Sequence, residues 1–106
     1  MRKPLVEVLT FEGCPHGEPA LELARRVVAD VGVPATVRRV DVPDATAAAA
    51  QRFLGSPSIR VNGRDIEPGA AERDRFVLSC RVYRTESGIK GEPDERWLRD
   101  ALHADT

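Results

Sequence analysis

The sequence has few cysteines, little net charge and no long apolar run, and each of these shortages argues against a class of protein. It holds two cysteines in 106 residues, too few for a disulfide framework, which favours a reducing, cytoplasmic setting. The formal net charge is −1, so we expect no strong attraction to nucleic acid or to an anionic membrane. No apolar run approaches the ~20 residues that span a bilayer, and the apolar start is too short for a signal peptide. From these shortages we expect a small soluble protein.

What is present suits one globular domain over residues 1–106. Apolar residues make up 42% of the chain and charged residues 31%, which is ordinary for such a domain. A chain of this length can bury a core without disulfides or metal. Hydrophobic spacing predicts alternating strands and helices. The predicted elements are a strand at 5–11, a helix with an apolar stripe over 20–31, a strand at 36–42, a helix at 45–54, a hairpin over 58–66 and a helix at 93–102.

This order predicts an α/β fold with a mixed sheet of four strands. The first strand, helix and strand favour a parallel pair with a right-handed crossover. Asn62-Gly63 is a strong hairpin signal and adds an antiparallel strand, so we expect helices on both faces of a mixed sheet. Residues 68–91 form an insert before the last helix, within which 76–83 is ambiguous between strand and loop and 86–91 is turn-like.

Cys14 is the first candidate for chemistry, because it lies where the first strand gives way to a helix. A helix that begins near Pro15 would direct its free N–H groups and its dipole at the sulfur, which lowers a cysteine pKa. His16 is close in sequence and would add positive charge when protonated. The alternative is a small buried hydrophobic residue, since free cysteines are often buried.

Cys80 is the second thiol, and it could resolve a disulfide made by Cys14 if the two Cα atoms lie within ~7 Å. The neighbouring Arg81 would favour a thiolate there. The surrounding apolar run instead favours Cys80 as a core residue. A metal site built from Cys14, Cys80 and the two histidines has poor spacing for zinc, so we predict no metal and no cofactor.

Two stretches carry a resemblance to a known family. Gly13-Cys14-Pro15-His16-Gly17 after the first strand and Gly55-Ser56-Pro57-Ser58-Ile59 before the hairpin resemble the thioredoxin-fold family. The resemblance covers nearly the whole chain except 68–91. Stretches 11–16, 53–57, 61–65 and 80–83 are similar to small bacterial thioredoxin-like proteins, which are sometimes labelled as related to alkylmercury lyases.

The resemblance implies a thioredoxin-like fold in which Cys14 is the attacking thiol of a thiol–disulfide oxidoreductase. It implies that Pro57 is cis and packed beside Cys14, and that the backbone of Ser56 pairs with an extended thiol substrate by strand addition. Gly13 and Pro15 would shape the turn, and His16 would tune the charge. The substrate would be a protein or small thiol or disulfide, and the protein a monomer or homodimer.

One departure from the family pattern limits this interpretation. Gly17 stands where the usual Cys-x-x-Cys motif has its second cysteine, so a local dithiol is excluded. Three outcomes remain open. Cys14 works alone through a mixed disulfide with a small thiol such as glutathione, or Cys80 resolves it, or the fold is a non-catalytic module that binds a protein partner or a thiophilic metal.

Overall fold

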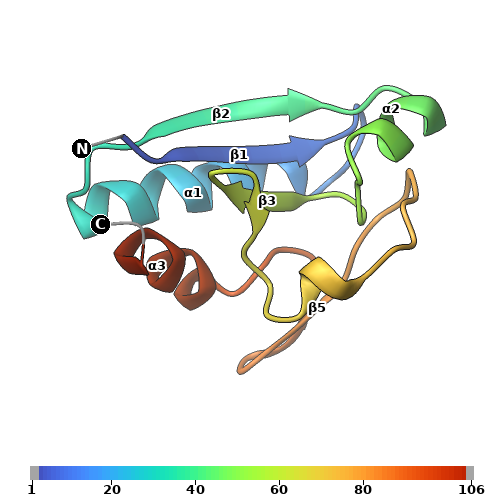
Figure 1. Ribbon diagram of the computed structural model, residues 1–106. Helices are drawn as coiled ribbons and strands as arrows, with labels where there is room; N and C mark the ends of the chain where they lie inside the picture. Colours follow the sequence, from blue (N-terminus) through green and yellow to red (C-terminus); the bar gives the residue numbers. More distant parts are fainter. Residues whose placement is uncertain (1–2, 105–106) are drawn as a thin grey trace.

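The computed structural model describes residues 3–104 and contains a four-stranded sheet in the order β2-β1-β3-β4 (Figure 1). β1 pairs with β2 in parallel and with β3 antiparallel, and β4 closes the hairpin with β3. The mixed sheet predicted from the sequence is therefore confirmed. The strands are β1 (Leu5–Thr10), β2 (Thr36–Asp41), β3 (Ser58–Val61) and β4 (Arg64–Asp65).

Two of the three helices, α1 (Gly17–Val31) and α3 (Glu95–Ala104), pack side by side on one face of the sheet, below it in Figure 1. The alternation of a strand directs Val6 and Val8 of β1 to this face, where they meet the apolar stripe of α1. This layer is the main core. Its fully or nearly fully buried members include Val6, Val8, Ala20, Ala24, Val27, Ile59, Leu98 and Leu102.

The opposite face of the sheet is covered only at one end. There α2 (Ala45–Ala50) packs with Leu9, Val42 and Phe53 in a small second cluster. The rest of that face carries charge, because Glu7 of β1 pairs with Arg38 of β2 at 2.5 Å. The expectation of helices on both faces therefore holds only at the end where α2 lies.

The second helix is shorter than predicted and ends at Ala50. Arg52 adopts a left-handed conformation (φ 54°), its N–H donates to the Ala49 carbonyl, and the Phe53 N–H donates to the Ala48 carbonyl at 2.9 Å. This pattern is a Schellman motif with an arginine in the position that glycine usually takes. The early stop turns Phe53 inward to the second cluster, so the helix does not reach residue 54 as predicted.

The insert has more structure than the sequence indicated. One 3-10 turn, η1 (Ala70–Glu72), is followed by a chain without helix or strand and then by a hairpin of β5 (Tyr83–Thr85) and β6 (Gly88–Lys90). The hairpin was predicted only as a turn. Its anchor is Tyr83, which is buried with its ring centroid 6.0 Å from that of Trp97 in α3.

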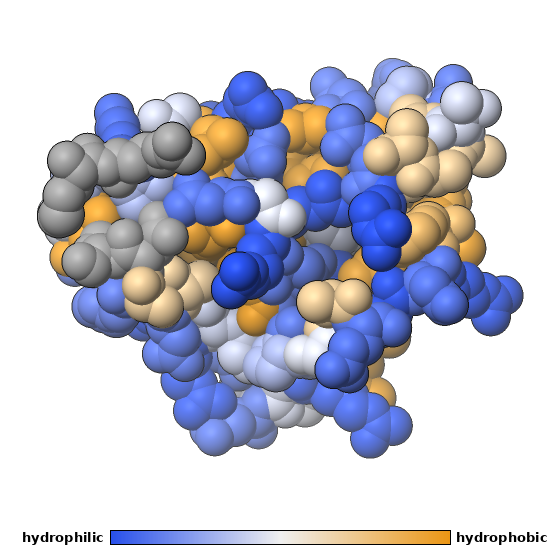
Figure 2. All heavy atoms as spheres, viewed as in Figure 1, coloured by the Kyte–Doolittle hydropathy of each residue, from blue (hydrophilic) through white to orange (hydrophobic). Residues whose placement is uncertain are grey.

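Hydrophilic residues cover most of the face seen in Figure 2, with hydrophobic ones showing between them. Large exposed hydrophobic side chains occur in the insert and hairpin, at Leu78, Val82 and Ile89. Within residues 3–104, no helix has both the length and the apolar character that crossing a membrane requires.

Candidate functional site

Cys14 lies in the turn that joins β1 to α1. The turn is closed by the Cys14 N–H, which donates to the Phe11 carbonyl at 3.2 Å, and by the Gly17 N–H, which donates to the Cys14 carbonyl at 3.3 Å. Gly13 takes φ 88°, a left-handed conformation that suits glycine. The helix begins at Gly17, two residues later than the expected start near Pro15. Cys14 is partly exposed to solvent.

Four groups that can donate hydrogen bonds act on the Cys14 sulfur, although the 2.7 Å bond between the Thr10 and Ser56 hydroxyls uses one of the two hydroxyl protons. Burial raises the pKa of Cys14, but the hydroxyls of Ser56 and Thr10 oppose it. The backbone N–H groups of His16 and Gly17, at the open end of α1, also lower the pKa. The donors outweigh burial, and the pKa of Cys14 lies below its ordinary value. A larger share of the thiol is therefore ionised near neutral pH.

Thr10 is a site residue that the sequence reasoning missed. Its hydroxyl lies 2.7 Å from the Ser56 hydroxyl, and both residues are almost fully buried. Thr10 is the last residue of β1, and Ser56 is 46 positions away in the chain, so only the folded sheet brings them together. A polar residue at the end of a strand that is apolar apart from Glu7 was the available signal.

Gly17 has a packing reason to be glycine. A Cβ at this position would lie 2.6 Å from the Thr10 hydroxyl oxygen, closer than real Cβ contacts allow. The second cysteine of a Cys-x-x-Cys motif therefore has no room beside Thr10. The same oxygen that supports the Cys14 thiol occupies the space that a cysteine at position 17 would need.

Ser56 uses its backbone as well as its side chain. Its N–H donates to the Ser79 carbonyl at 2.8 Å, and its carbonyl accepts from the Arg81 N–H at 2.9 Å, which makes a parallel bridge between Ser56 and Cys80. Gly55 permits this close approach, because a Cβ there would lie 2.8 Å from the Arg81 Cβ. The Ser56–Pro57 peptide bond is cis. Both backbone hydrogen-bonding groups of Ser56 are thus paired with the protein's own chain, at Ser79 and Arg81.

Cys80 is exposed, so the expectation that it is a core residue is wrong. Its position opposite Ser56 is nevertheless informative. Paired residues on adjacent strands are about 4.8 Å apart and project their side chains from the same face. The Cys80 side chain therefore projects from the same face of the bridge as the Ser56 side chain, whose hydroxyl lowers the pKa of Cys14. Both thiols are free.

Arg81 points into the protein and holds the chain next to Cys80 in place. Its guanidinium pairs with Asp65 and with Glu67, each at 2.7 Å, and donates to the Ser58 hydroxyl at 2.8 Å. Burial lowers the pKa of Arg81, but the hydrogen bond with Asp65 and the nearby charges raise it overall. The Tyr83 ring lies 4.5 Å from the guanidinium carbon. Arg81 is therefore a structural anchor. The sequence had instead suggested that Arg81 stabilises a thiolate at Cys80.

Tyr83 of the β5–β6 hairpin also holds the proline segment in place. The Tyr83 hydroxyl donates to the Pro57 carbonyl, and burial raises the pKa of that hydroxyl.

His16 presents its backbone to Cys14, while its imidazole Nδ1 contacts the Glu92 carboxylate and its ring packs on Gly91. Tuning of Cys14 by His16 thus comes through the backbone N–H.

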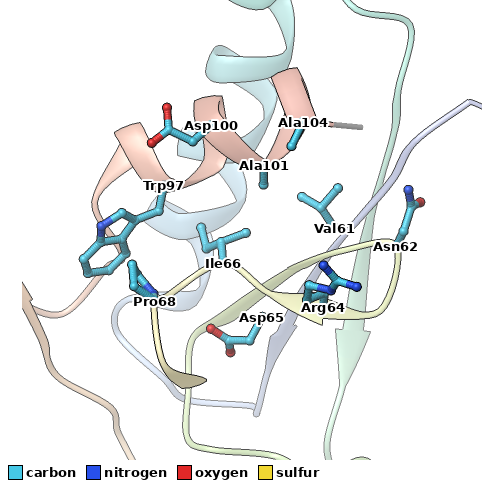
Figure 3. Close-up of a pocket in the computed structure, with 10 residues that line it drawn as sticks. All are labelled: Val61, Asn62, Arg64, Asp65, Ile66, Pro68, Trp97, Asp100, Ala101 and Ala104. Atoms are coloured by element: carbon cyan, nitrogen blue, oxygen red, sulfur yellow. The ribbon is translucent and has the colours of Figure 1, made fainter. Parts of the chain in front are cut away.

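A separate hollow of about 420 Å³ lies between the β3–β4 hairpin and α3, with Trp97 and Ile66 on its wall (Figure 3). None of the candidate site residues lines it. Among residues 3–104, no group of three or more histidine, cysteine, aspartate or glutamate side chains is arranged to hold a metal ion. No family model and no curated protein matches the sequence.

Proposed function

We propose that the protein has a thioredoxin-like fold and performs thiol–disulfide exchange with Cys14 as the nucleophile. The observation that carries the proposal is the polar surroundings of the Cys14 sulfur, supplied by the buried Thr10–Ser56 hydroxyl pair and by the backbone N–H groups at the start of α1. A partly exposed thiol with a lowered pKa is the form that attacks a disulfide. The turn after β1 and the proline segment before β3, which meet at Ser56, support the fold assignment.

In the first step the Cys14 thiolate attacks one sulfur of a substrate disulfide. A mixed disulfide forms, the substrate S–S bond breaks, and the other sulfur leaves as a thiolate. In the second step the Cys80 thiolate attacks the Cys14 sulfur and releases the remaining substrate thiol. The substrate gains two electrons as two thiols, and the protein is left with a Cys14–Cys80 disulfide, which a thiol reductant would restore. The bridge between Ser56 and Cys80 supports this role for Cys80.

Alkylation by iodoacetamide at a series of pH values tests the first step, with each cysteine followed separately by peptide mass spectrometry. We expect the alkylation of Cys14 to reach half its maximal rate below the ordinary thiol pKa of about 8.5. A midpoint at or above that value would contradict an activated nucleophile and favour a non-catalytic binding module.

Mild oxidation tests the second step. We expect an intramolecular Cys14–Cys80 disulfide in the wild-type protein after treatment with an excess of oxidised glutathione. The Cys80→Ser variant should instead accumulate glutathione on Cys14. If the wild-type protein also stops at the glutathione adduct, Cys80 is not the resolving thiol, and Cys14 works alone.

A further inference from the structure

The resemblance to thioredoxin-fold proteins implies that an extended substrate adds as a strand at the backbone edge of Ser56, and this edge is already occupied. Both hydrogen-bonding groups of Ser56 are used by residues 79–81, hereafter the plug segment. A bound peptide would have to break the 2.8 Å and 2.9 Å bonds that Ser56 makes with Ser79 and Arg81. We therefore propose that this site takes low-molecular-weight disulfides and that the plug segment excludes extended peptide disulfides. This inference rests on the proposed function.

The plug segment is held from both sides, so it is not a loose loop. Upstream, the Val77 N–H donates to the Phe53 carbonyl at 3.0 Å. Within the segment, the Arg81 guanidinium is buried against the carboxylates of Asp65 and Glu67. Downstream, the Tyr83 hydroxyl bonds to the Pro57 carbonyl. Displacing the segment would leave buried polar groups without partners, which is costly.

Cys14 stays reachable while the peptide edge is closed. Cys14 is partly exposed, and the adjoining Gly13 and Pro15 are exposed. A small disulfide needs only the sulfur and a short approach to it, with no backbone pairing at Ser56. A small disulfide can therefore react with Cys14 while the plug segment stays in place, whereas an extended peptide disulfide has to displace the segment.

The test compares two substrates that differ only in length. N-acetylcysteine amide and a ten-residue peptide with one central cysteine are each prepared as the mixed disulfide with 2-nitro-5-thiobenzoate. In the Cys80→Ser variant, Cys14 attacks the cysteine sulfur, forms a mixed disulfide and releases the coloured thiolate, so one absorbance reports both reactions. Rates are divided by those of free glutathione with the same substrates.

We expect the small disulfide to react at least about tenfold faster, since two ordinary hydrogen bonds are worth roughly that factor. Asp65→Asn, which weakens the hold on Arg81, should bring the ratio toward one. Asp74→Asn removes the same charge from an exposed position on the insert and should leave the ratio unchanged. If Asp65→Asn does not fold, Tyr83→Phe replaces it, because it loosens the segment by a single hydroxyl.

Equal or faster reaction of the peptide would overturn the proposal while leaving Cys14 as the nucleophile. A high ratio that neither loosening variant lowers would also overturn it, because the selectivity would then come from elsewhere than the plug segment. Reaction of neither substrate faster than free glutathione would remove the proposed function, and this inference would fall with it.

Discussion

The buried cluster around Arg81 gives the most direct test of what holds the insert to the domain. The Arg81 side chain is 1% exposed and its partner Asp65 11% exposed, at a distance of 2.7 Å. Removing one partner of a buried ion pair typically costs about 3–5 kcal/mol. In Asp65→Asn the amide oxygen can still accept a hydrogen bond, and Glu67 still balances the charge at 2.7 Å. We therefore expect a loss of about 2 kcal/mol in the free energy of unfolding, below the full cost of an unpaired charge.

Urea unfolding followed by the fluorescence of Trp97 measures this loss. Trp97 is the single tryptophan of the chain, and its ring lies 6.0 Å from that of Tyr83, so it reports on the region around Arg81. A loss of this size is a large part of the 5–15 kcal/mol typical of a domain, yet the variant should remain folded. The midpoint should fall with an unchanged dependence on urea.

The control is a salt bridge of similar length at the surface. Glu18 lies 2.6 Å from Arg39, with side-chain exposures of 66% and 37%. Exposed ion pairs contribute about 0–1 kcal/mol, so Glu18→Gln should cost well under half the loss in Asp65→Asn. Equal losses in the two variants, or a loss below about 0.5 kcal/mol for Asp65→Asn, would refute the view that burial of Arg81 makes the difference.

The remaining predictions concern Cys14 and one helix end. Ser56→Ala and Thr10→Val should each raise the pKa of Cys14, read from iodoacetamide rates against pH, whereas an unchanged profile would exclude the hydroxyls as donors. Because the folded pKa of Cys14 is lowered, the reduced protein should gain stability as pH rises toward about 8.5 and lose it as pH falls through the folded value. Cys14→Ser should flatten this trend in urea titrations, and a trend that persists would assign it to another group. Gly17→Cys should cost about 1–3 kcal/mol through its clash with Thr10, and a further Thr10→Ala should recover part of it. If the double variant is no more stable, the clash is not the cause. Asp94 accepts from the Arg96 N–H at the start of α3, so Asp94→Ala should cost about 1 kcal/mol in thermal unfolding and Asp94→Asn little. Equal losses would show that charge matters more than capping.

The regular elements could be predicted because their signals are local. The apolar period of α1 and the Asn62-Gly63 turn each follow from a few adjacent residues, and both turn residues take the expected positive φ. The end of α2 could not be predicted in this way. Arg52 takes a conformation that glycine favours, because the Schellman bonds and the burial of Phe53 outweigh its local preference.

The candidate site was predictable only in part, for a related reason. Cys14, Ser56 and Pro57 stand in recognisable stretches, so the sequence could single them out. Thr10 and Arg81 act through partners far away in the chain, and neither stands in a pattern that announces a role. The hairpin of β5 and β6 was missed because it depends on the burial of Tyr83 against α3, which no local alternation reveals.

Ser56 explains how a site without a local dithiol can still be organised around two cysteines. Its hydroxyl, paired with Thr10, lowers the pKa of Cys14, and its backbone pairs with the chain on both sides of Cys80. The Thr10 oxygen that completes this pair leaves no room for a side chain at Gly17. A cysteine at position 17 would thus have to displace the Thr10 hydroxyl that pairs with Ser56. The resolving thiol that we propose, Cys80, comes from the other side of the Ser56 bridge and would leave the hydroxyl support of Cys14 in place.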